Sequence, residues 1–109
     1  MKPLRKCEGA AMRELILDGR QIKTRADLHA ALKVGLELPD YYGNNLDALW
    51  DMLTGHIGLP QMLRWTYFHR SQQLLAGYAQ DAYALMKRAE REGTGFLVRK
   101  YRYGYTARG

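Results

Sequence analysis

The chain has 109 residues, of which 47 % are apolar and 26 % are charged, which fits one globular domain and is too short for two separate cores. No apolar stretch approaches the roughly 20 residues needed to cross a bilayer, and the first residues lack the apolar block of a signal peptide. A single cysteine, Cys7, excludes an intrachain disulfide, and together these features predict a cytoplasmic protein with no membrane association.

The predicted elements begin with a short buried strand at residues 14–17, followed by an Asp-Gly turn signal. Thr24 and Asp27 then form a capping-box pattern, and apolar residues follow at helical spacing. This pattern predicts a helix over about 25–34, which we expect Gly35 to end.

A second helix is predicted after a loop that contains Pro39 and Gly43, with Asn45 as its N-cap. Its core-facing stripe has the spacing i, i+3, i+4, i+7 and consists of Leu46, Leu49, Trp50 and Leu53. Asp47, Asp51 and Thr54 form the adjacent stripe, and Gly55 closes the segment.

The second half of the chain predicts a strand at residues 62–65, a short helix at 71–75, a longer helix from about 78 that stops at Gly93, and a strand beginning at 96–98. Ser71 is expected to cap the short helix. Because parallel neighbours need crossover connections, strands alternating with helices predict a small parallel sheet. His29, in the first helix, is expected to be partly exposed or bonded to local groups.

The charged residues divide the chain into one acidic window and a basic remainder. Residues 34–63 contain no lysine or arginine, although the whole chain has seventeen. This window carries four acidic residues, for a net charge of −4, so the remaining residues carry +10 within the total of +6. Such an acidic island can steer a cationic partner to one face.

Asp47 and Asp51 lie one turn apart in the predicted second helix. They could serve as metal ligands or as an acid and base, with His56 as the nearest further ligand, or they could form a solvated acidic face. Like charges at this spacing destabilise a helix, which favours a binding role. The rings around the pair are typical of interface centres, and each could lie in the core or at an interface: Tyr41, Tyr42, Trp50 and His56. We expect no catalytic residues, no metal site and no cofactor.

Basic and aromatic residues alternate from Arg99 to Arg108, which leaves open an alternative function as a small nucleic-acid-binding module. The other interpretation of this tail is a last strand followed by a solvated basic extension.

The run Leu38-Pro39-Asp40-Tyr41-Tyr42-Gly43-Asn44-Asn45-Leu46-Asp47-Ala48-Leu49-Trp50-Asp51, continued by Leu53-Thr54-Gly55, closely resembles the signature of barstar-like ribonuclease inhibitors. The resemblance extends from about Ile16 to Val98. It implies an α/β fold with a three-stranded parallel sheet and about four helices. It also implies one barstar-like domain over residues 1–109, with a core at about 12–101 and extensions at 1–11 and 102–109.

The resemblance implies that the protein is not an enzyme but an intracellular inhibitor, immunity protein or antitoxin. Its partner would be a cognate barnase-like or toxin ribonuclease, bound as a 1:1 heterodimer without nucleic acid, and the free chain would be a monomer. In the family the second helix and the loop before it enter the enzyme's active site. The expected partner-binding residues are Tyr41, Tyr42, Gly43, Asn45, Leu46, Asp47, Ala48, Trp50, Asp51, Thr54, Gly55, His56 and Glu92.

A ribonuclease active site gathers cations to hold phosphates, so carboxylates on the inhibitor can occupy phosphate positions. By family position Asp51 is expected to be the dominant anchor and Asp47 the second. Two positions depart from the family pattern: His56 replaces a tryptophan, and Arg88 replaces a glutamate, while Glu92 remains. These departures predict a differently charged ribonuclease or an interbacterial toxin domain as the partner.

Overall fold

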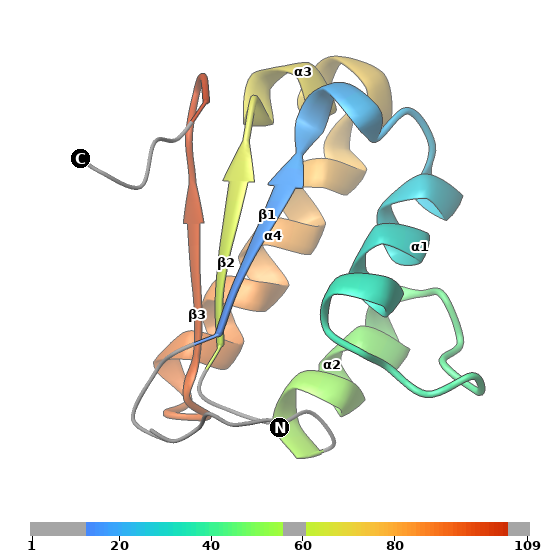
Figure 1. Cartoon of the computed structure of the whole chain (residues 1–109), viewed down its shortest axis with the longest axis vertical. Helices are drawn as coiled ribbons and strands as arrows, with labels where there is room; N and C mark the ends of the chain where they lie inside the picture. Colours follow the sequence, from blue (N-terminus) through green and yellow to red (C-terminus); the bar gives the residue numbers. More distant parts are fainter. Residues whose placement is uncertain (1–12, 56–60, 105–109) are drawn as a thin grey trace, which may run out of the picture.

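The computed structural model describes residues 13–55 and 61–104. Three strands, four α-helices and one short 3-10 helix follow one another in the order β1 (Arg13–Asp18), η2 (Gly19–Gln21), α1 (Arg25–Gly35), α2 (Leu46–Gly55), β2 (Gln61–Thr66), α3 (Phe68–Leu75), α4 (Gly77–Arg91) and β3 (Phe96–Lys100). The three strands pair in parallel in the order β1-β2-β3, and the helices lie along one side of the sheet (Figure 1). This architecture confirms the predicted α/β fold.

One face of the sheet lies against the core, and the other is buried only in part. Leu17, Leu63 and Val98 point into the core, where they are at most 2 % exposed. On the opposite face Ile16 is 53 % exposed, beside the paired position Arg64 of β2. The prediction of a buried strand at residues 14–17 was therefore wrong except at Leu17, because none of the described helices covers the face of β1 that carries Ile16.

The start of α1 confirms the predicted capping box, since the Asp27 amide donates to Thr24 Oγ1 at 3.1 Å and the Thr24 amide donates to Asp27 Oδ2 at 3.1 Å. The helix ends at Gly35, as predicted, but not through a left-handed glycine. Gly35 is still helical, and a Cβ there would lie 2.4 Å from Leu15 Cδ1, so glycine lets α1 approach the sheet closely. The left-handed residue of this helix end is Glu37, with φ of 57°.

The short helix α3 begins at Phe68, three residues before the predicted start, and Ser71 is not its cap. Ser71 is buried within the helix, where its Oγ accepts a hydrogen bond from Trp65 Nε1 at 2.9 Å. A serine that looks like a cap in the sequence thus satisfies the polar atom of a fully buried tryptophan. The stop after α4 is as predicted, because Gly93 has φ of 78°.

Candidate functional site

The helix α2 presents its polar stripe to solvent because its apolar stripe is held in the core. Leu49 and Leu53 are fully buried, whereas Asp47 and Asp51 are exposed. The helix begins where predicted: Asn45 Oδ1 accepts a hydrogen bond from the Ala48 amide at 2.7 Å. This side-chain cap fixes the first turn, and with it the direction of Asp47.

The loop before α2 is anchored through Tyr42. Its hydroxyl lies 2.6 Å from Nδ1 of His29, whose Nε2 lies 2.6 Å from the hydroxyl of Tyr78. The three side chains therefore connect the loop to α1 and α4. Tyr42 is 4 % exposed and His29 is 1 % exposed, whereas the neighbouring Tyr41 is 72 % exposed.

These burials correct the prediction for His29 and decide the alternative that was open for Tyr42, which lies in the core. His29 is neither partly exposed nor bonded to local groups, because both of its partners are distant in the sequence. The Tyr42 ring lies in the core and positions the loop, so it offers little surface to a partner. Burial lowers the pKa of His29 and raises the pKa of Tyr42 and of Tyr78, which favours the uncharged form of all three groups at neutral pH.

Two hollows flank α2. The first, of about 620 Å³, is lined by Asp47, Trp50, Asp51, Ala84, Leu85, Arg88 and Arg91. The second, of about 460 Å³, is lined by Tyr41, Gly43, Ala48, Asp51, Met52, Thr54 and Gly55. Asp51 lines both hollows, so it lies on the ridge between them.

The first hollow is bipolar. Asp47 and Asp51 of α2 line it together with Arg88 and Arg91 of α4. The guanidinium carbon of Arg88 lies 5.0 Å from the centroid of the half-buried Trp50 ring, within the range of a cation–π interaction. The cations that α2 itself lacks are thus supplied by the neighbouring helix.

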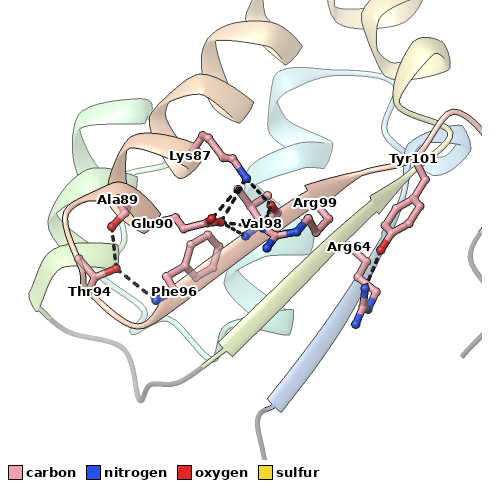
Figure 2. Close-up of polar contacts among 9 residues, drawn as sticks. All are labelled: Arg64, Lys87, Ala89, Glu90, Thr94, Phe96, Val98, Arg99 and Tyr101. Carbon is pink, nitrogen blue, oxygen red and sulfur yellow. Dashed lines mark hydrogen bonds and ion pairs between the residues drawn. The ribbon is translucent and has the colours of Figure 1, made fainter.

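A polar clamp around Glu90 holds the end of α4, which carries both arginines, against β3 (Figure 2). Glu90 Oε1 accepts hydrogen bonds from the Val98 amide and from Arg99 Nη1, each at 2.9 Å, and Lys87 Nζ lies 3.3 Å from Oε2. Burial alone would raise the pKa of Glu90, but these hydrogen bonds outweigh it and hold the pKa below its ordinary value. Glu90 therefore stays charged, and the clamp holds in place the part of α4 that carries Arg88 and Arg91, here called the arginine wall of the first hollow.

Most of the predicted site residues come together around α2. Eight of them line one or both hollows: Tyr41, Gly43, Asp47, Ala48, Trp50, Asp51, Thr54 and Gly55. Leu46 packs against the core, and Asn45 acts as the helix cap. Glu92 is the exposed C-cap residue of α4 and is not among the residues that line either hollow, and His56 lies outside the described residues.

Sequence reasoning did not assign Arg91, Ala84, Leu85 or Met52 to the site, and it noted Arg88 only as a departure from the family pattern. A signal was present, because residues 84, 88 and 91 share one face of a helix at the spacing i, i+4, i+7. Which way that face points depends on how α4 packs against α2.

Among the described residues, no group of three or more histidine, cysteine, aspartate or glutamate side chains is arranged to hold a metal ion. Nor does the described part of the chain contain a helix long and apolar enough to span a membrane.

Comparison with known proteins identifies the family. The family model described as "Barstar (barnase inhibitor)" matches residues 12–101. A protein of Bacillus subtilis (strain 168) named "Putative ribonuclease inhibitor YrdF" is 46 % identical over 81 residues, which cover 74 % of this chain and 89 % of that protein. With a matching sequence signature, a matching fold and this relative, the chain belongs to the barstar family.

Proposed function

We propose that this protein is a stoichiometric inhibitor that binds one cognate ribonuclease, as a 1:1 heterodimer, and blocks its active site. The observation that supports this most directly is the position of Asp51 on the ridge between two hollows. A partner that fills both hollows surrounds this carboxylate and removes it from water. Such a central, desolvated position is where interfaces concentrate their binding energy.

The active site of a ribonuclease must present cations toward RNA phosphates. Asp47 and Asp51, one helical turn apart, can accept charge-assisted hydrogen bonds from those cations in place of two phosphates. Tyr41 and the half-buried Trp50 supply apolar contact area on either side of the pair. The protein thus acts as a mimic of the substrate backbone and needs no catalytic group, metal or nucleic acid of its own.

The arginine wall narrows the choice of partner. A wholly basic ribonuclease surface would meet repulsion from Arg88 and Arg91 as soon as it engaged the first hollow. We therefore expect a ribonuclease whose active-site cations are bordered by a carboxylate that faces the two arginines. A toxin ribonuclease of the same cell fits this expectation, with the present chain as its cytoplasmic immunity protein, monomeric before it binds.

Substitution of Asp51 tests this function. The inhibition constant of Asp51→Ala is measured in an RNA-cleavage assay against barnase-like and toxin ribonucleases, including any encoded beside this chain. We expect at least about 30-fold weaker inhibition, which corresponds to a hot-spot loss of about 2 kcal/mol or more. The largest known losses of this kind were measured in the barnase–barstar complex, which belongs to the same family.

Asp81→Ala is the matched control, because it removes the same charge from an exposed position that lines neither hollow. It should inhibit as well as the wild-type chain. Equal inhibition by both variants would contradict a central role for Asp51, and wild-type inhibition by Asp47→Ala combined with Asp51→Ala would contradict phosphate mimicry altogether.

A further inference from the structure

A second charged surface lies at the carboxyl edge of the sheet, toward the opposite end of the molecule from α2 (Figure 1). Two further hollows open there. One of about 230 Å³ is lined by Phe68, His69, Gln72, Lys100, Tyr101 and Arg102, and one of about 410 Å³ is lined by Arg20, Tyr67, His69, Arg70 and Tyr103. His69 belongs to both, so the two hollows form one continuous surface, here called the edge surface.

The edge surface is cationic. Arg70, Lys100 and Arg102 are exposed and line the hollows, while the charge of Arg20 is compensated by Asp18 at 2.9 Å. Within the described part of the chain, no acidic residue lines either hollow. The edge surface therefore differs from the bipolar hollow beside α2 and suits an anionic ligand.

Aromatic rings lie among these cations. Tyr103 is 63 % exposed, and its ring meets the His69 ring edge to face at a centroid distance of 5.9 Å. The Arg20 guanidinium carbon lies 4.1 Å from the centroid of the Tyr67 ring. An exposed ring bordered by cations offers what a single nucleic-acid strand requires, namely a face for a base and charges for its phosphates.

Backbone hydrogen bonds hold the segment that carries these groups in place. The Tyr67 amide donates to Tyr103 O at 3.2 Å, and the Phe68 amide donates to Tyr101 O at 3.0 Å. His69 Nδ1 lies 2.9 Å from Arg102 O. Residues 101–103 are thus fastened to the start of α3, so that the cations and the exposed tyrosine keep fixed relative positions.

We propose that the edge surface binds single-stranded nucleic acid, with phosphates on Arg70, Lys100 and Arg102 and an unstacked base on Tyr103. This activity is separate from ribonuclease inhibition, because no residue that lines the edge surface also lines either of the two hollows beside α2. The ligand would be a short RNA strand, for which each cation contributes charge neutralisation and the tyrosine contributes stacking.

Fluorescence anisotropy with a labelled single-stranded RNA of about ten nucleotides tests the proposal. Three phosphate contacts predict that the logarithm of the affinity falls with the logarithm of salt concentration with a slope of roughly −2. Arg70→Gln, Lys100→Gln and Arg102→Gln together should weaken binding by roughly 10- to 100-fold at low salt. The control variant Arg13→Gln, Lys23→Gln and Lys33→Gln, which has the same net charge, should bind nearly as well as the wild-type chain.

Tyr103 separates base stacking from charge attraction. Tyr103→Ala should weaken RNA binding by roughly 5- to 100-fold, whereas Tyr103→Phe, which keeps the ring, should not. Equal losses in the two triple variants, no effect of Tyr103→Ala, or equally tight binding of polyglutamate or anionic vesicles would overturn the proposal. Circular dichroism confirms that each variant is folded, and inhibition of the ribonuclease should be unchanged, so failure here would leave the inhibitor function untouched.

Discussion

Replacing Tyr42 with phenylalanine tests how the loop before α2 is held. The substitution keeps the ring and removes one hydroxyl, so it deletes the 2.6 Å hydrogen bond to His29 and leaves the ring packing in place. Because His29 is only 1 % exposed, water cannot easily replace the lost partner. Leaving a buried polar atom without a partner costs about 1 to 3 kcal/mol, which lowers the Tm of a chain near this length by roughly 4 to 12 °C.

Urea unfolding followed by circular dichroism at neutral pH measures this loss, and Tyr41→Phe is the matched control. Tyr41 is the neighbouring residue but is 72 % exposed, so removal of its hydroxyl should change the free energy of unfolding by less than about 0.5 kcal/mol. Equal stability of the two variants would refute the inference that Tyr42 anchors the loop.

A double-mutant cycle isolates the interaction itself. His29→Leu combined with Tyr42→Phe replaces both partners with apolar groups, so the loss should be smaller than the sum of the two single losses. A strictly additive result would mean that the contact between the two side chains contributes nothing to stability.

Three further results are expected. Burial lowers the pKa of His29, so below about pH 6.5 the unfolded chain gains a proton at this residue while the folded chain does not. The free energy of unfolding should therefore be highest above that pH and fall below it by up to about 1.4 kcal/mol per pH unit. In urea titrations His29→Gln should flatten this slope. Arg88→Glu should slow association with the cognate ribonuclease by roughly tenfold at low salt and less at high salt in stopped-flow measurements, while Arg88→Lys should not; faster association of the Glu variant would mean that the partner is basic there. Gly19→Ala should destabilise the fold by about 1 to 3 kcal/mol, because its Cβ would lie 2.3 Å from Tyr67 O. A Cβ at Gly77 would meet no atom within 4 Å, so Gly77→Ala should be neutral or stabilise the fold by up to about 1 kcal/mol. The reverse order of stability in thermal unfolding would contradict the packing described for these glycines.

The elements that could be predicted from the sequence are those with local causes. The capping box of α1 and the Asn45 cap of α2 depend on side chains within three residues of the amides they bind. The apolar stripe of α2 likewise follows from its spacing, and with it the outward direction of Asp47 and Asp51.

The errors concern residues whose partners are distant in the sequence. His29 was expected to be partly exposed because nothing near it in the chain shows that Tyr42 and Tyr78 will enclose it. Ser71 has the composition of a helix cap, but its role is set by Trp65 and the packing of α3 against β2. The left-handed residue after α1 is Glu37, which the sequence does not mark, while Gly35 ends the helix and packs against the distant Leu15.

By itself the sequence determined the fold class, the family and the acidic helix, because these depend on periodicity, capping and a signature read along one segment. Tertiary structure alone decided the setting of that helix: two hollows that share Asp51, and an arginine wall contributed by α4. It likewise gathered the edge surface from η2, α3 and the segment after β3. The physical reason is that a binding surface is defined by which faces of separate elements meet, and this depends on how the shared core packs.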